Sequence, residues 1–232
     1  MKRAHMMLIV MALLGLGQPL MSEFSVTLAN YIGLYAMVAL GLVLLTGIGG
    51  LTSFGQAAFV GIGAYTTAYL STAYGISPWG TLAVGIAITS GVALFLGWIT
   101  LRLSGHFLPL GTIAWGISLY FLFGNLDALG GHSGLGGIPA VNLFGWDLKS
   151  NRSFFYLIWA LLLAIIVTTQ NMLDSRDGRA MRSLRAGIMS EAMGIDTLWY
   201  KMVIFMLAAW CACLSGWMYA HMQRFVNPTP FS

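Results

Sequence analysis

The amino-acid sequence predicts an all-α protein, a polytopic transmembrane helical bundle of about seven spans. Hydrophobic residues make up 58% of the 232 residues and charged residues only 8%, with a mean hydropathy of +0.82. Soluble domains usually contain roughly 25% charged residues. In addition, the stretch 24–101 contains no Asp, Glu, Lys, Arg or His. Because a soluble core of this size could not bury so much apolar surface, the class is a helical membrane protein.

Most of the apolar runs are long enough to cross a hydrocarbon layer of about 30 Å. The first run follows Lys2 and Arg3, as in a signal peptide, but no A-x-A cleavage pattern follows it, which favours an uncleaved span. Pro109 lies near the start of the fifth run and predicts a kinked or broken helix there. The predicted spans are Met6–Met21, Ser25–Thr46, Leu51–Leu70, Trp79–Leu101, Phe107–Gly124, Phe154–Asn171 and Met202–Met222.

The span Leu51–Leu70 combines small and polar residues. Polar side chains inside a span usually face protein or a water path, so Thr52, Ser53 and Gln56 are candidate residues of a solute path. The alternative is that Gln56 only forms a hydrogen bond with a neighbouring helix. Small residues recur every three or four positions and predict close approach of another backbone: Gly55, Ala58, Gly61, Ala64 and Ala68.

Half of the charged residues lie in one segment, Asp174–Lys201, which must therefore lie outside the bilayer. Basic residues concentrate on the cytoplasmic side of membrane proteins. With a cytoplasmic N-terminus, the side that carries this segment has eight basic residues and the other side has three, which places the segment in the cytoplasm. The charged residues of the segment are Asp174, Arg176, Asp177, Arg179, Arg182, Arg185, Glu191, Asp196 and Lys201.

The charged segment is predicted to contain a short amphipathic helix that begins near Asp177-Gly178 and is interrupted at Gly187. Ser190–Gly194 would form a second turn that ends at Gly194. Three interpretations remain open: a solvated loop, a helix on anionic lipid, and a docking helix for a cytoplasmic protein. The mixture of acidic and basic residues favours the protein partner. On a helical wheel, Arg179, Arg182 and Arg185 share an arc of about 120°, opposite Ala180, Met181, Leu184 and Ile188.

A glycine-rich loop, Gly130–Pro139, lies between the fifth and sixth spans. No Lys-Ser/Thr pair follows its glycines directly, so we interpret it as a tight loop packed on the mouth of the bundle and not as a phosphate loop. The chain contains no nucleotide-binding motif, and any ATP would be bound by another polypeptide. The net charge of +4 is concentrated near the membrane edges and does not indicate nucleic-acid binding.

Three stretches resemble the permease subunits of branched-chain amino acid ABC importers. Gly49–Tyr65 is similar to the family's GQAAF-x-GIGAY signature, and Gly130–Pro139 is similar to its glycine-rich external loop. Gly178–Arg185, followed by Glu191–Ile195, resembles the family's cytoplasmic coupling segment. The likeness runs from about Gly33 to the end of the chain.

The resemblance implies a pore-forming transporter subunit of a bacterial inner membrane, without enzymatic activity or a cofactor of its own. Residues 1–232 would form a single permease domain, with the coupling segment at 174–201. Its partners would be a second homologous permease, two cytoplasmic ATPase subunits and an external binding protein that delivers leucine, isoleucine or valine. The residues expected to contact the ATPase are Gly178, Arg179, Arg182, Arg185, Glu191, Ala192 and Gly194.

The sequence departs from the family pattern at two places. The stretch 186–190 lacks the acidic residues that the family often carries there, and the chain stops where these permeases continue into further spans. We therefore expect a sequence that is truncated at its C-terminus. Alternative functions are an ABC permease for urea, short amides or another small solute, an ATP-independent channel or carrier, and a membrane anchor without a transport role.

Overall fold

The computed structural model describes residues 19, 21–101, 107–143, 146–148 and 150–231. The predicted first span, Met6–Met21, lies outside the described residues except at its last positions. The other six predicted spans each correspond to a helix. The long helices are α2 (Glu23–Leu42), α3 (Gln56–Ala73), α4 (Pro78–Thr100), α5 (Phe107–Asn125), α6 (Asn151–Asp174) and α9 (Thr197–Gln223).

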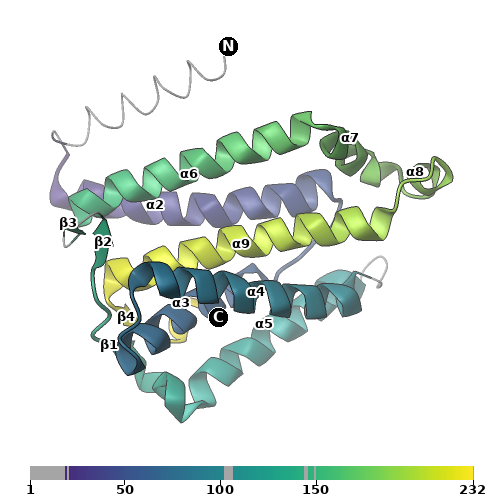
Figure 1. The fold of residues 1–232 in the computed structure, drawn as a ribbon. Helices are drawn as coiled ribbons and strands as arrows, with labels where there is room; N and C mark the ends of the chain where they lie inside the picture. Colours follow the sequence, from purple (N-terminus) through teal and green to yellow (C-terminus); the bar gives the residue numbers. More distant parts are fainter. Residues whose placement is uncertain (1–18, 20, 102–106, 144–145, 149, 232) are drawn as a thin grey trace.

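The described part of the chain is a helical bundle, as the sequence predicts (Figure 1). Five helical segments are long and apolar enough to cross a membrane: α4, α5, α6, α9, and α2 together with the π-helix Val43–Ile48 that continues it. Helix α3 is not among them, and its sequence is richer in glycine and hydroxyl side chains. The chain is therefore a multi-pass membrane protein.

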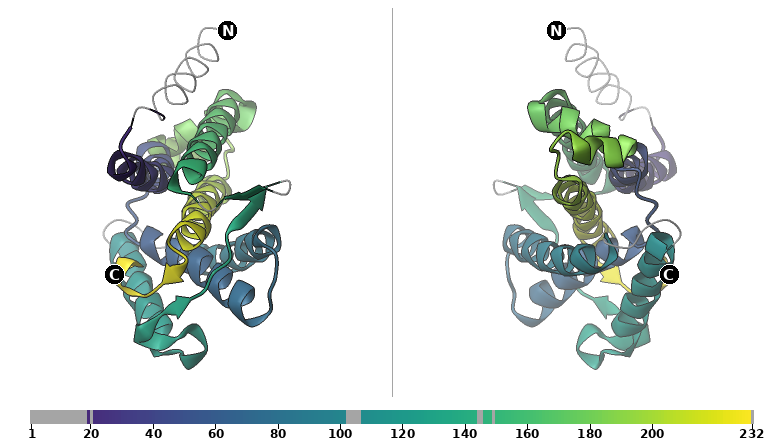
Figure 2. Two further views of the ribbon diagram at one scale, coloured as in Figure 1. Left: turned by 90° about the vertical axis from the view of Figure 1, so that its left-hand side faces the viewer. Right: turned by 90° about the vertical axis from the view of Figure 1, so that its right-hand side faces the viewer.

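Helix α9 forms the centre of the bundle and contacts α2, α3 and α4 (Figure 2). In the most apolar 18-residue stretch of α9, 61% of the residues are buried, compared with 22% in the corresponding stretch of α5 at the periphery. Side-chain hydrogen bonds join α9 to its neighbours: Ser215 donates to the Leu34 carbonyl of α2 at 3.0 Å, and the Trp217 indole donates to the Pro78 carbonyl of α4 at 2.9 Å. Such bonds hold helices together where no water competes for the polar groups.

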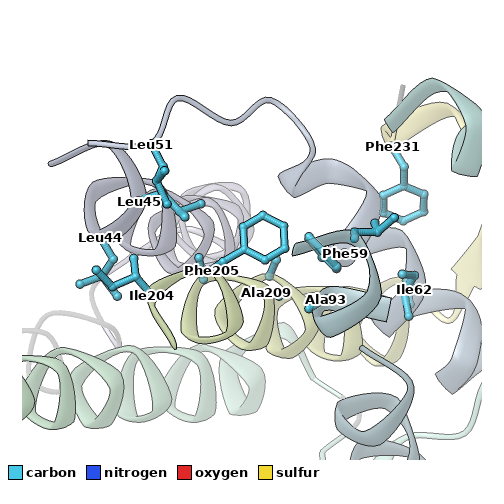
Figure 3. Close-up of a cluster of buried hydrophobic side chains, with 14 of the residues drawn as sticks. Leu44, Leu45, Leu51, Phe59, Ile62, Ala93, Ile204, Phe205, Ala209 and Phe231 are labelled. Carbon is cyan, nitrogen blue, oxygen red and sulfur yellow. The ribbon is translucent and has the colours of Figure 1, made fainter. Parts of the chain in front are cut away.

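Helices α3 and α9 lie in direct backbone contact at Gly216. A Cβ atom at this position would collide with the carbonyl oxygen of Val60 and would lie 3.0 Å from the amide nitrogen of Ala64. The predicted small-residue face of α3 is thus engaged, because Ala64 belongs to it, and Gly61 packs on the Phe123 ring of α5. Apolar side chains of the π-helix Val43–Ile48, α3, α4 and α9 form the main hydrophobic core (Figure 3).

The predicted span that starts at Leu51 is wrong in its first five residues, which are not helical. Residues 51–55 belong to no helix or strand, and α3 begins only at Gln56. Gly50 has a φ of 65°, and the amide of Phe54 donates to the Thr112 hydroxyl of α5 at 3.1 Å. This bond to a side chain of α5 satisfies the Phe54 amide without a helix, so the segment can stay non-helical between helices. Non-helical backbone at membrane depth is tolerated where protein or a cavity surrounds it.

The expectation of a kink at Pro109 is also wrong. Helix α5 runs without interruption from Phe107, and Pro109 lies in its first turn. Backbone amides of the first turn have no acceptor within the helix, so the missing N–H of proline costs nothing there.

One end of the bundle is closed by the glycine-rich loop and short strands. The 3₁₀ turns Asp127–Leu129 and Gly131–Ser133 lead into β1 (Leu135–Gly136), which pairs with β4 (Phe225–Val226), and β2 (Val141–Leu143) pairs with β3 (Trp146–Leu148). His221 Nδ1 lies 2.8 Å from the Pro139 carbonyl oxygen, and Ile138 is buried. The predicted tight loop on the bundle mouth is confirmed.

Candidate coupling segment and solute pocket

The charged segment lies at the end of the bundle opposite the strands (Figure 1). Helix α7 (Arg176–Ser183) is followed by the 3₁₀ turn Leu184–Ala186 and by α8 (Ile188–Ala192). The predicted interruption at Gly187 is confirmed, with a φ of 54°. Three predicted boundaries differ. Helix α7 begins at Arg176, and the turn predicted over Ser190–Gly194 is α8 at Ile188–Ala192. Helix α9 already begins at Thr197, because the Asp196 carboxylate accepts from the Trp199 amide at 3.0 Å.

Helix α7 turns away from α6 at Ser175, and Gly178 packs against the end of α6. The Ser175 hydroxyl caps α7 by accepting from the Gly178 amide at 3.2 Å, and a Cβ at Gly178 would collide with the backbone of Leu173. Only glycine therefore fits this position without moving the chain. Met181 of α7 and Leu184 of the following 3₁₀ turn are both buried in the core, as the predicted apolar arc requires.

The three arginines of the predicted polar arc are all exposed, but they differ in their contacts. Arg182 forms an ion pair with Asp174 at 3.3 Å. Arg185 donates to the Thr46 carbonyl oxygen of the π-helix Val43–Ile48 at 3.4 Å. Arg179 has no partner among the described residues. The Arg179 side chain therefore forms no hydrogen bond or ion pair with the described part of the chain, whereas Arg182 and Arg185 each bond to another residue of it.

Further contacts tie the segment to α9. The Tyr200 hydroxyl donates to Asp177 at 3.1 Å, and the Thr197 hydroxyl donates to Glu191 at 2.6 Å. Ala192 and Gly194 are exposed beside Glu191, and Gly194 has a φ of 80°. The segment therefore contacts the π-helix Val43–Ile48, α6 and α9 at once.

Two exposed methionines of this segment were not predicted from the sequence as binding residues. Met189 is 66% exposed and Met193 is 76% exposed, on either side of Glu191. Flexible apolar side chains of this kind are common at protein-binding surfaces. Their signal in the sequence is that they are apolar residues in a charged segment, outside the predicted inner arc.

A second feature is a pocket of about 280 Å³ between α2, the first turn of α3, and α9. Ser53 and Gln56 line it, whereas Thr52 is exposed and does not. The structure thus brings together two of the three predicted path residues. Residues that the sequence analysis missed form most of the wall: Tyr31, Leu34, Tyr35, Val60, Tyr219 and Phe231.

Two polar side chains of this pocket are buried without a hydrogen-bond partner. Gln56 is 4% exposed and Ser53 is 5% exposed, and neither side chain has a hydrogen-bond partner among the described residues. The alternative role for Gln56, a hydrogen bond to a neighbouring helix, is thus not found in the structure.

Among the described residues there is also no cluster of three or more His, Cys, Asp or Glu that could hold a metal ion.

Comparison with known proteins identifies the family of this chain. The profile of the family described as branched-chain amino acid transport system / permease component matches residues 24–232. The chain belongs to this permease family. It is 30% identical over 256 residues to the high-affinity branched-chain amino acid transport system permease protein LivM of Salmonella typhimurium, and equally to that of Escherichia coli.

Both alignments cover 99% of this chain but 60% of each relative, so the chain spans about three fifths of their length. No solved structure matches the chain. Membership of a transport permease family agrees with the expectation of a transporter subunit.

Proposed function

We propose that the chain is a membrane-spanning permease subunit of an ATP-driven importer that carries leucine, isoleucine and valine across a bacterial inner membrane. The family match over residues 24–232 supports the class, and the two LivM relatives support the solute. Its partners would be two cytoplasmic ATPase subunits, a second homologous permease and an external binding protein. Residues 1–232 would form one permease domain, and residues 174–201 its cytoplasmic coupling segment.

The observation that carries the mechanism is the contact between Arg185 and Thr46. Arg185 donates to the Thr46 carbonyl at 3.4 Å, and a Cβ at Gly50 would lie 3.8 Å from Arg185 Cγ. Thr46–Gly50 leads directly into the non-helical stretch 51–55 and then to Gln56 in the pocket. A displacement of the coupling segment would therefore move the wall of the pocket through only a few residues, as alternating access requires.

ATPase docking is proposed to use Gly178, Arg179, Arg182, Arg185, Glu191, Ala192 and Gly194, now joined by Met189 and Met193. The exposed, unpartnered Arg179 supports this assignment best, because its replacement breaks no described contact within the chain. We expect Arg179→Glu to weaken co-purification of the ATPase subunits with the permease, while Arg179→Lys, which keeps the charge, retains it. Undiminished ATPase capture by Arg179→Glu would remove Arg179 from the docking surface.

The choice of solute is tested separately. The second candidate is import of urea or a short amide, which the uncharged pocket could also accept. We expect membrane vesicles with the assembled importer to take up labelled leucine and not labelled urea, and only with ATP. Uptake by the reconstituted chain without ATPase subunits would instead indicate a channel or carrier.

A further inference from the structure

The pocket beside Gln56 combines a mostly aromatic and aliphatic wall with a polar corner at Ser53 and Gln56. Tyr31, Leu34 and Tyr35 of α2 form one side, and the ring centroid of Phe231 lies 6.0 Å from that of Tyr219. None of the described residues that line the pocket is charged. Its volume of about 280 Å³ is near the lower end for small-molecule sites, which fits one small solute.

The polar corner lies at the N-terminus of α3. Gln56 is the first residue of this 18-residue helix, and no side chain caps the helix. The first backbone N–H groups of a helix have no acceptor within it, and the helix dipole places partial positive charge there. Such an end attracts a carboxylate, and broken helices in transporters present their N-termini to the anionic group of a substrate in this way.

An independent observation points to the same corner. Gln56 and Ser53 line the pocket, and both amide atoms of Gln56 and the hydroxyl of Ser53 are buried without a hydrogen-bond partner among the described residues. Buried polar groups in native proteins are nearly always satisfied, and a persistent exception calls for a missing partner. A solute that both donates and accepts hydrogen bonds would satisfy all three atoms.

We propose that this corner binds the zwitterionic end of the transported amino acid. The carboxylate accepts hydrogen bonds from the first amides of α3, from Gln56 Nε2 and from Ser53 Oγ, and the ammonium donates to Gln56 Oε1. The apolar side chain rests on Tyr31, Leu34 and Tyr35. Amino acids with a charged side chain are rejected because the wall offers no opposite charge and burying an unpaired charge is costly. The inference rests on the proposed function and assigns a solute site to the permease itself.

The first test measures occupancy of the pocket directly. Val60 is half-buried in the pocket wall, and Val60→Cys provides a thiol there once the buried Cys211 and Cys213 are replaced by alanine. In the assembled importer, we expect L-leucine to slow maleimide labelling of this thiol, while leucinol, which lacks the carboxylate, and L-lysine do not. Adding Gln56→Leu should abolish the protection. Equal protection by leucine and leucinol, or no labelling at all, would overturn the carboxylate site.

The second test uses transport. We expect Gln56→Leu to lower the initial rate of leucine uptake at least roughly tenfold, the size expected for losing a hydrogen bond to a charged group. The matched control, Gln170→Leu, changes an exposed glutamine of α6 outside the pocket and should transport normally. Both variants should still co-purify with the ATPase subunits. Wild-type rates in Gln56→Leu would sink the inference alone, whereas absence of leucine uptake by the wild-type importer would sink the proposed function.

Discussion

Arg185 and Thr46 are separated by 139 positions in the sequence, yet the Arg185 guanidinium donates to the Thr46 carbonyl oxygen at 3.4 Å. This bond joins the charged segment to the π-helix Val43–Ile48, just before the non-helical stretch that leads to Gln56. The ends of α6 and α9 are held by the same segment through Asp174–Arg182 and Asp177–Tyr200. The segment therefore contacts the π-helix, α6 and α9 at one end of the bundle.

Replacing Arg185 should uncouple transport from ATP hydrolysis. We expect Arg185→Ala to lower the amount of leucine imported per ATP hydrolysed, because the segment would no longer pull on Thr46–Gly50. The measurement is uptake and phosphate release in the same proteoliposomes. Arg176→Ala removes an exposed arginine of α7 with no partner among the described residues and should leave the ratio unchanged. An unaltered ratio in Arg185→Ala would show that this contact does not transmit the motion.

Gly216→Ala should destabilise the bundle. The added Cβ would collide with the backbone of α3 at Val60, and overpacking of a tight core costs about 1–3 kcal/mol. A lower unfolding temperature in detergent would report this loss. Gly91→Ala is the matched control, because a Cβ at this helical glycine of α4 meets nothing within 4 Å. Equal unfolding temperatures for the two variants would contradict the close packing of α3 on α9.

The proposed orientation can be tested with single cysteines in a background where Cys211 and Cys213 are alanine. Met193→Cys should react with a membrane-impermeant maleimide only after the cells are permeabilised, because the coupling segment is placed in the cytoplasm. Gly137→Cys, in the loop at the opposite end, should react in intact cells. The reverse pattern would invert the topology and remove the coupling hypothesis.

The helices were predictable because each apolar run in the sequence is continuous and long. The start of α3 was not predictable, since residues 51–55 are not helical and the Phe54 amide bonds instead to Thr112, 58 positions away. A local pattern contains no information on such a partner. The inner and outer faces of α7 follow from helical periodicity, and Met181 and Leu184 confirm the predicted arc.

The candidate sites were predictable only in part. Ser53 and Gln56 were identified as polar residues in an apolar stretch, but the pocket also needs Phe231, which reaches α3 because β4 pairs with β1. The anchoring role of Arg185 was equally hidden, because its acceptor is the backbone carbonyl of a distant threonine. Tertiary contacts decide both features.

The central claim is that this chain carries branched-chain amino acids as part of an ATP-driven importer. The most direct measurement is uptake of labelled leucine into proteoliposomes that contain the chain with its second permease and ATPase subunits, supplied with binding protein. We predict uptake that requires ATP and this chain, and that excess isoleucine or valine suppresses but urea does not. Uptake that persists without this chain, or without ATP, would contradict the account.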